Sequence, residues 1–554
     1  PTILYFSRFA RNDIIVAVLT LGIVIVMWRH LHEQQNRYLY ILAGLLALAF
    51  SSKETMYLFI IPMSLFLVFL SLNDIKGLFL GRLRLSQLGP AATLLLMFVT
   101  LSLPLVAAGI SIFQGPLEIV LSNDDSSAGL IGMPVGAGRF VAALTVASTL
   151  AVSVAIGLMW NWRKWLISMG IFTTIWVLLY TNFFTSPFGI VTGVWQGLGY
   201  WLAQQDVARG DQPWYYYIVI GWNYEFLPIV VGMISAVWYA IRGDVFTKFL
   251  ISWIGLNIVL FTIASEKMPW LLVHLTLPAI LLTARALGDL IENLPWSRIY
   301  QSGSLLSLPI IPLILIFGYR LAFSNFGGVN FSAIIELWGL LLLVFGAMGL
   351  ALYLASRAGY REGFALVGLA IVGVLLILSG RAGWIASFRN ADTPTEMLVY
   401  TQSSPDIARI ARDVARVAAS SGQQNNLSIS VDGDDGYSWP WVWYFRDYNS
   451  VSFPSYGGDV QPTNNNGGVV LLNANNWKEA DQASVEADFA QIQKFKHRWW
   501  FPEGYRDLSG LGEKDLWNRI AGYFLFRDFP TDQLGSIDGV AYFPEDFETT
   551  NTYL

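Results

Sequence analysis

The sequence predicts a multi-spanning α-helical membrane protein with a C-terminal α/β domain outside the membrane. Of its 554 residues, 55% are hydrophobic and only 13% are charged, whereas soluble domains carry about 25% charged residues. The shortage of charged residues is in the part of the chain before Gly380, where apolar runs approach the ~20 residues that cross a bilayer. We therefore divide the chain into a membrane region, 1–380, and a water-soluble region, 381–554. Because the chain opens with Pro1 and no Met, we expect a further N-terminal segment.

Hydropathy predicts about twelve spans in the membrane region. Two of the shorter runs are separated only by residues 51–54, which predicts a hairpin whose tip just reaches the membrane surface. The predicted span cores are 14–28, 39–50, 56–72, 93–113, 140–159, 165–183, 216–240, 249–264, 270–287, 305–317, 331–354 and 364–378.

Basic residues in short loops set the predicted orientation, because cytoplasmic loops are enriched in Lys and Arg. One alternate set of loops holds most of them and is predicted to be cytoplasmic. The opposite loops and the C-terminal region are then extracytoplasmic. The basic residues of the cytoplasmic set are Arg29, Arg37, Lys76, Arg82, Arg84, Arg163, Lys164, Arg242, Lys248, Arg285, Arg298, Arg357 and Arg361.

The water-soluble region alternates helical and strand patterns, which predicts a small α/β layer fold. Helices are expected at 405–419 and 513–526, and strands at 427–431 and 468–472. The net charge of −5 and the lack of a basic stripe argue against a nucleic-acid partner. The absence of Cys excludes disulfides and thiolate metal sites.

Two motifs of the water-soluble region have competing interpretations. Asp432 and Asp434 fit a polar turn after a strand, because the rest of a calcium-loop spacing is missing. The aromatic runs at 437–444 and 499–501 fit the domain core, with stacking on sugars or contact with the membrane surface as the alternatives.

Charged side chains at the extracytoplasmic ends of the spans are the candidate functional residues, because a charge near the hydrocarbon core is costly. Arg8, Arg11 and Asp13 precede or begin the first span, which suits Asp13 as a base or metal ligand beside arginines that bind an anionic substrate. The alternative is capping of the helix by Asp13 and its neighbour. Lys53 and Glu54 occupy the hairpin tip, where Lys53 suits a phosphate; the alternative is an internal ion pair.

A second group follows in the chain. The loop 204–217 combines Asp206, Arg209 and Asp211 with an aromatic run, and Glu225 lies further into the next span. The aromatic residues fit an interfacial belt, while the charged ones are either functional or part of an ordinary solvated loop. Glu225 requires a partner or a wet cavity.

The third group joins two spans with almost no loop. Glu266 and Lys267 precede a span in which His274 lies one turn along, on the same side as Trp270. Lys267 would clamp a lipid phosphate. The alternative is a satisfied helical histidine and a helix that starts at Pro269.

Several of these segments resemble one prokaryotic family, the flippase-activity-associated proteins. That family is similar to the GT-C glycosyltransferases, which include protein O-mannosyltransferases and lipid A aminoarabinose transferases. The most specific motifs are Arg-Gly-Asp-Gln-Pro-Trp-Tyr-Tyr-Tyr and Glu-Lys-Met-Pro-Trp, and the similarity extends over nearly the whole chain. The matching segments are 5–13, 52–55, 207–217, 224–228, 266–270 and 401–406.

The resemblance implies a GT-C-like enzyme of the prokaryotic cytoplasmic membrane. Such an enzyme moves a sugar from a polyprenyl-phosphate donor to a protein or glycan acceptor on the outer face. The family carries an acidic residue in a first outer loop, which would lie upstream of Pro1, and Asp13 matches the second-loop acidic position. Lys53 and Lys267 match positions suited to the lipid phosphate, whereas Gln205 stands where His would be expected.

On this hypothesis the catalytic candidates are Asp13, Glu54 and Asp206. No cofactor is assigned, and a divalent cation stays open. The alternatives are a non-catalytic accessory subunit with partners in a membrane complex, and a lipid-linked sugar flippase; convergence of the charged groups on one outer cavity would favour the enzyme. The candidates for binding substrate or lipid phosphate are Arg8, Arg11, Lys53, Arg209, Glu225, Glu266, Lys267 and His274.

Overall fold

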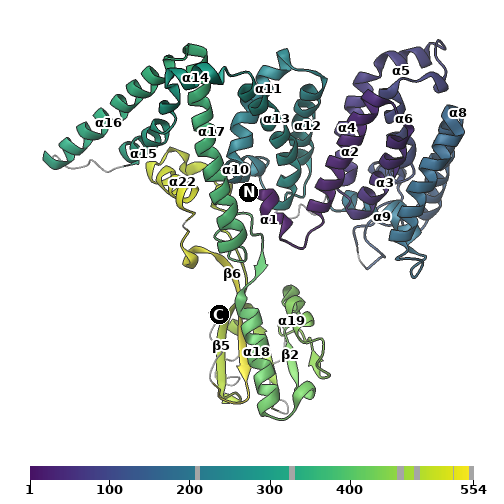
Figure 1. Cartoon of the computed structure of the whole chain (residues 1–554). Helices are drawn as coiled ribbons and strands as arrows, with labels where there is room; N and C mark the ends of the chain where they lie inside the picture. Colours follow the sequence, from purple (N-terminus) through teal and green to yellow (C-terminus); the bar gives the residue numbers. More distant parts are fainter. Residues whose placement is uncertain are drawn as a thin grey trace. The chain divides into compact units, whose positions relative to one another are not determined.

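The chain folds into two compact units, Pro1–Gly383 and Trp384–Leu554, in a computed structural model (Figure 1). The first unit is helical and contains apolar helices long enough to cross a membrane, and the second is built on a six-stranded sheet. The predicted fold class, a multi-spanning helical protein with a C-terminal α/β domain, is confirmed. The structure describes residues 1–125, 127–205, 212–323, 331–457, 467–479, 487–527 and 529–547.

The helices of the first unit follow the apolar runs of the sequence. Its α-helices are α1 (Thr2–Ser7), α2 (Asp13–Glu33), α3 (Asn36–Ser52), α4 (Met56–Leu70), α5 (Leu72–Phe79), α6 (Pro90–Ser102), α7 (Gln114–Leu117), α8 (Gly138–Tyr180), α9 (Gly189–Ala203), α10 (Tyr216–Tyr224), α11 (Phe226–Arg242), α12 (Val245–Ile263), α13 (Leu272–Glu292), α14 (Trp296–Ser302), α15 (Ile310–Phe323), α16 (Phe331–Ser356) and α17 (Tyr360–Trp384). Its 3-10 segments are η1 (Leu85–Gln87), η2 (Ala107–Phe113), η3 (Pro269–Leu271) and η4 (Ser304–Ser307).

Within the described ranges, seven helical stretches are long and apolar enough to span a membrane, or up to ten if each bent pair counts as one span. The bent pairs are α4 with α5, α6 with the η2–α7 segment, and α10 with α11, at angles of 70°, 74° and 108°. This count, made by length and composition, is lower than the about twelve spans that hydropathy predicts, and the number of spans stays a prediction.

The predicted and the counted numbers of spans differ because of two places in the chain. The helix α3 is only 17 residues long, which is shorter than any of the seven stretches. The predicted spans 140–159 and 165–183 both lie in α8, which counts once.

The helix α8 nevertheless folds back on itself at Asn161, whose backbone is not helical (φ −161°, ψ 99°). The ring of Trp165 lies 2.2 Å from the position that a Cβ atom on Gly157 would occupy. Eight residues of straight helix would separate these two residues by about 12 Å. The 43-residue element thus consists of two helical segments that pack together, and Gly157 makes room for the indole ring.

The second unit contains a mixed sheet with the strand order β1-β5-β6-β4-β2-β3. The strands β2, β3 and β4 are parallel, whereas β1, β5 and β6 join by antiparallel pairing. The elements are η5 (Ile385–Arg389), β1 (Gln402–Ser403), α18 (Pro405–Ser420), η6 (Gln424–Asn426), β2 (Ile429–Val431), η7 (Asp434–Gly436), α19 (Trp439–Tyr444), β3 (Val451–Ser452), β4 (Val469–Asn473), α20 (Ala474–Glu479), β5 (Gln491–Trp500), η8 (Gly504–Arg506), η9 (Ser509–Gly512), α22 (Lys514–Phe526), η10 (Thr531–Gln533) and β6 (Gly535–Phe543).

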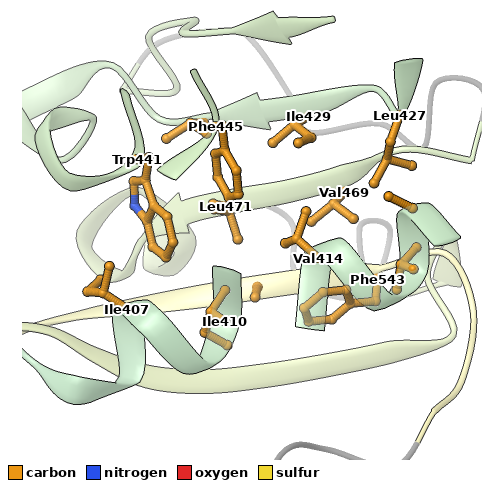
Figure 2. Close-up of a cluster of buried hydrophobic side chains, with 14 of the residues drawn as sticks. Ile407, Ile410, Val414, Leu427, Ile429, Trp441, Phe445, Val469, Leu471 and Phe543 are labelled. Atoms are coloured by element: carbon orange, nitrogen blue, oxygen red, sulfur yellow. The ribbon is translucent and has the colours of Figure 1, made fainter. Parts of the chain in front are cut away.

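One face of this sheet carries the main core of the unit (Figure 2). The helix α18 begins at Pro405, with the Ser404 side chain accepting a hydrogen bond from the N–H of Asp406 as a cap. Its apolar side, with Ile407, Ile410 and Val414, packs against the buried side chains of the strands. The spacing of these residues is the helical period that the sequence shows.

The aromatic run of α19 is divided between core and surface. Trp441 is fully buried and stacks on Phe445, and Tyr437 lies in the same cluster. Trp439 and Trp443 are 75% and 66% exposed. The core interpretation therefore applies to some of these residues only.

Candidate functional site

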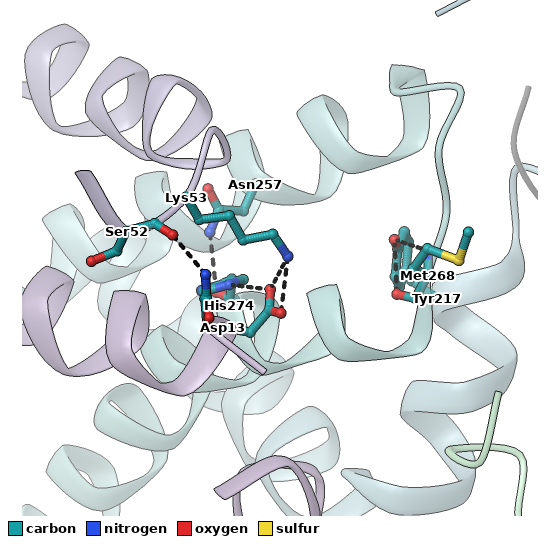
Figure 3. A network of polar contacts seen from close by, with 8 residues as sticks. Asp13, Ser52, Lys53, Tyr217, Asn257, Met268 and His274 are labelled. Carbon is teal, nitrogen blue, oxygen red and sulfur yellow. Dashed lines mark hydrogen bonds and ion pairs between the residues drawn. The ribbon is translucent and has the colours of Figure 1, made fainter. Parts of the chain in front are cut away.

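Three segments of the first unit meet around the carboxylate of Asp13 (Figure 3). Asp13 is the first residue of α2 and is fully buried. Lys53 follows α3 in an extended conformation, at the predicted hairpin tip. His274 lies in the first turn of α13 and is also buried. These residues are 40 and 261 positions from Asp13 in the chain.

The Asp13 carboxylate is held by two basic side chains. The Nζ atom of Lys53 donates to both oxygens, at 2.8 Å to Oδ1 and 2.9 Å to Oδ2. The Nε2 atom of His274 lies 3.3 Å from Oδ1. Burial without such partners would be costly for a carboxylate, so the contacts account for its position. Asp13 therefore binds across the fold, in addition to being the acidic first-turn residue of α2, while no side-chain capping hydrogen bond is formed there.

Further hydrogen bonds fix the segments that carry these groups (Figure 3). Asn257 of α12 donates to the backbone carbonyl of His274 at 3.1 Å. The Asn12 side chain donates to the carbonyl of Ser52 at 2.9 Å, which ties the start of α2 to the end of α3.

The short connection before α13 is held in a separate way. The hydroxyl of Tyr217 lies 3.2 Å from the backbone N of Met268, from which it accepts, and 3.3 Å from the carbonyl of the same residue, to which it donates. Tyr217 is buried. Part of the aromatic run that fits an interfacial belt is thus used inside the protein.

Arg11 forms the more accessible side of the site. Its guanidinium carbon lies 3.3 Å from the ring centroid of Trp270, and Nζ of Lys53 lies 5.9 Å from the same ring. Partial burial lowers the pKa of Arg11, while the neighbouring carboxylates of Asp13, Glu266 and Glu54 act in the opposite direction. Glu54 and Glu266 are both partly exposed. The arrangement offers cations and accessible carboxylates beside one aromatic ring, which suits an anionic, partly apolar ligand.

The other candidate residues fall into different surroundings. The buried Lys267 directs its Nζ to the carbonyl of Ala264 at 2.9 Å. Glu225 accepts a hydrogen bond from the backbone N–H of Thr2 at 2.7 Å. Arg8 is exposed at the end of α1. The predicted Asp206, Arg209 and Asp211 lie outside the described residues.

Convergence of the charged groups is therefore found for part of the predicted set. Asp13, Lys53 and His274 are in direct contact, and Arg11, Glu54 and Glu266 are their electrostatic neighbours. The ion pair of Lys53 is with Asp13 and not with Glu54, which differs from the alternative of an internal pair at the hairpin tip.

Sequence reasoning missed Asn257 and the structural role of Tyr217. Asn257 is a fully buried amide within a predicted span, and a polar group at such a depth is itself a signal of a specific contact. Tyr217 carried no such signal, because tyrosines at a membrane boundary are common.

The second unit holds a polar cluster at the ends of β2 and β4. The Asp432 carboxylate accepts hydrogen bonds from the N–H of Asn473 and the side chain of Asn476, and Asp434 accepts from Ser455. Burial raises the pKa of Asp432, whereas the Ser455 hydroxyl contributes most to a lowered pKa of Asp434.

These bonds fit the polar-turn interpretation, since η7 is a 3-10 turn. Among the residues that the structure describes, no three His, Asp or Glu side chains are grouped so as to hold a metal ion.

Comparison with known proteins finds a family over the N-terminal part of the chain. Residues 1–102 match the family model described as dolichyl-phosphate-mannose-protein mannosyltransferase. Asp13, Lys53 and Glu54 all lie in the matched segment. No curated protein and no solved structure gives a significant match. The N-terminal part of this chain is thus similar to a mannosyltransferase family, and the chain resembles the GT-C glycosyltransferases.

Proposed function

We propose that this protein is a membrane glycosyltransferase that takes its sugar from a polyprenyl-phosphate donor. The observation that carries the proposal is the Asp13–Lys53 ion pair, buried at the start of a membrane helix and flanked by Arg11 on Trp270. It lies inside the segment that resembles a lipid-phosphate-dependent family. Ionisable groups at such a depth in a membrane protein are by default interpreted as part of a functional site.

In the proposed reaction the acceptor oxygen forms a bond to the anomeric carbon of the sugar while the bond from that carbon to the phosphate oxygen breaks. The polyprenyl phosphate leaves with the bonding electron pair. Lys53 and Arg11 stabilise the negative charge that develops on this phosphate. The acceptor proton passes to a carboxylate, and the partly exposed Glu54 fits this role better than the buried Asp13.

Asp13 then acts by orienting Lys53, with His274 holding the carboxylate from the other side. Glu266 beside Arg11 is proposed to orient the donor or acceptor. Three residues remain proposed contributors to substrate binding: Arg8, Glu225 and Lys267. Their proposed role is indirect, because they position the segments that carry the site. The proposed roles of Asp206 as a catalytic residue and Arg209 as a phosphate ligand concern residues outside the described ranges.

The finer assignments are part of the same proposal. The reaction would occur on the outer face of a prokaryotic cytoplasmic membrane, with the second unit extracytoplasmic and a protein or glycan as acceptor. The same proposal divides the chain into a membrane region, 1–380, and a soluble region, 381–554. It also assigns the chain to the flippase-activity-associated family.

One observation favours a second function, a non-catalytic subunit of a membrane complex. The Asp13 carboxylate has both oxygens engaged and no exposed surface. Such a closed network is also what a structural clamp between helices would contain. Binding of the donor distinguishes the two functions.

The first experiment measures binding of a polyprenyl-phosphate-linked mannose to the purified protein in lipid nanodiscs, which requires no acceptor. We expect saturable binding that Arg11→Gln weakens at least tenfold, because a charge-assisted contact to phosphate is lost. The matched control is Arg29→Gln, which removes an exposed arginine near the other end of α2. Release of polyprenyl phosphate on addition of candidate acceptors then tests Glu54→Gln. Absence of saturable binding, or equal affinity in Arg11→Gln and Arg29→Gln, would refute the proposal.

A further inference from the structure

A cavity of about 330 Å³ lies between α16 and α17, close to the turn that joins them. Figure 1 shows the two helices diverging from this turn, with α15 drawn between them further along. The walls are apolar and aromatic, with Leu352 and Tyr353 from α16 and Tyr360, Phe364 and Val367 from α17. Its volume falls in the range of ligand pockets.

The two helices touch at the narrow end of this wedge. A Cβ atom on Gly363 would lie 2.9 Å from the carbonyl oxygen of Ala355, so the glycine lets the two backbones approach. Beyond this contact both helices carry exposed apolar side chains, and only 11% of the apolar window of α16 and 17% of that of α17 is buried. The wedge therefore opens toward the surroundings of two membrane-spanning helices.

The wedge and the Asp13 site lie toward opposite ends of the membrane helices. At its other end α17 contacts α1, because a Cβ atom on Gly383 would lie 3.3 Å from the Cα atom of Pro1. The twenty residues from Gly363 to Gly383, at about 1.5 Å each, span roughly 30 Å, which is the thickness of the hydrocarbon core. A ligand in the wedge would thus lie in the opposite leaflet from the proposed donor site.

The rim of the wedge carries two arginines and a tyrosine, with Glu362 next to Arg361 in the sequence. Arg357 and Arg361 follow directly on the lining residues Ser356 and Tyr360, and both are exposed. In the part of the chain that the structure describes, neither arginine forms an ion pair. Cationic side chains at this level attract anionic lipid head groups, and tyrosines mark the membrane–water boundary.

We propose that the wedge binds an anionic phospholipid of the bilayer, with one acyl chain between α16 and α17 and the phosphate at Arg357 and Arg361. The apolar walls account for the chain, and the two arginines account for the choice of an anionic head group. This proposal is independent of the glycosyltransferase function, because it concerns the other end of the helices.

The test is native mass spectrometry of the full chain, released from detergent after incubation with phosphatidylglycerol or with phosphatidylcholine of the same acyl chains. We expect retention of phosphatidylglycerol in preference to phosphatidylcholine. Arg357→Gln/Arg361→Gln should weaken phosphatidylglycerol binding roughly 10- to 30-fold, from the usual contribution of two surface arginines. Val367→Phe, which fills the wedge, should weaken the binding of both lipids.

The matched control is Arg82→Gln/Arg163→Gln, which removes two exposed arginines from other loops of the same predicted face. Equal loss in this control, equal affinity for the two lipids, or undiminished binding in Val367→Phe would each overturn the proposal. A dimer in the spectrum that Val367→Phe abolishes would assign the wedge to a second copy of the chain and overturn it as well.

Discussion

The ion pair between Lys53 and Asp13 gives a quantitative prediction about stability. Lys53→Met removes the cation but keeps most of the side-chain volume, and it leaves the buried carboxylate with His274 alone. Breaking a buried pair by removing one partner typically costs about 3–5 kcal/mol. The Lys53 side chain is 13% exposed and that of Asp13 is 0% exposed, so partial access of water to the lysine places the expected loss near the lower end, about 3 kcal/mol.

The double variant Lys53→Met/Asp13→Asn separates the charge from the packing. It removes both ions and leaves an amide that can still contact His274. Because no unpaired charge remains, we expect at least half of the lost stability to return. Lys76→Met is the matched control, since Lys76 is exposed on α5 and its loss should change stability by less than about 0.5 kcal/mol.

The assay is reversible unfolding in mixed micelles of detergent and SDS, with the free energy of unfolding obtained for each variant. A loss below about 1 kcal/mol in Lys53→Met would mean that the Asp13 carboxylate is not buried as an ion. A double variant as unstable as Lys53→Met would show that the loss comes from the lysine side chain and not from the unpaired charge.

Three further predictions concern packing and pH. Trp441→Ala should cost about 3–5 kcal/mol in denaturant unfolding of the second unit, because this ring is fully buried, while the exposed Trp443→Ala should stay within about 0.5 kcal/mol. Gly157→Ala should destabilise by about 1–3 kcal/mol in the SDS titration, since its methyl group would lie 2.2 Å from a buried indole; Gly170→Ala, with open space around it, is the control. Burial lowers the pKa of His497 to about 3 from its ordinary value near 6.5, so the unfolded chain binds the extra proton first and stability should fall as pH drops through this window, by at most about 5 kcal/mol. A pH titration of His497→Phe should lack this dependence, and an unchanged titration curve would contradict the assignment.

The membrane helices could be predicted because their apolar runs are long and their ends carry turn residues or charges. The number of spans counted by length and composition is lower than predicted, since α3 is a short helix and the predicted spans 140–159 and 165–183 form one continuous element, α8, that reverses at Asn161. Hydropathy reports the environment of a segment and not the direction of its backbone. The sequence already predicts separate spans on either side of residue 161, and the packing of Gly157 on Trp165 shows that these two segments lie against each other.

The strand β5 shows why part of the second unit was not predicted from the sequence. Its buried side includes Gln493, Phe495 and His497, while Lys494 points to solvent. The alternation of a half-buried strand is present, but two of its buried positions are polar by residue type. The neighbouring strand β6 contains Gly535 and Gly539, which weaken any strand signal.

The candidate site was predictable as a list of residues but not as a set of contacts. A charged residue at a span end indicates that some partner exists, which identified Asp13 and Lys53. The identity of the partner depends on how distant helices pack, and so the sequence offered Glu54 as the alternative partner of Lys53 and did not pair His274 with Asp13.

The order in which this network is synthesised has a consequence for insertion into the membrane. Asp13 and Lys53 are 40 residues apart, so the ribosome delivers both within seconds, and the two charges can enter the bilayer boundary as a neutral pair. His274 follows roughly 220 residues later, which corresponds to about 10–45 s of translation. During this interval the lysine alone shields the carboxylate, and the nascent helices α2 and α3 stay joined as a hairpin until α13 arrives.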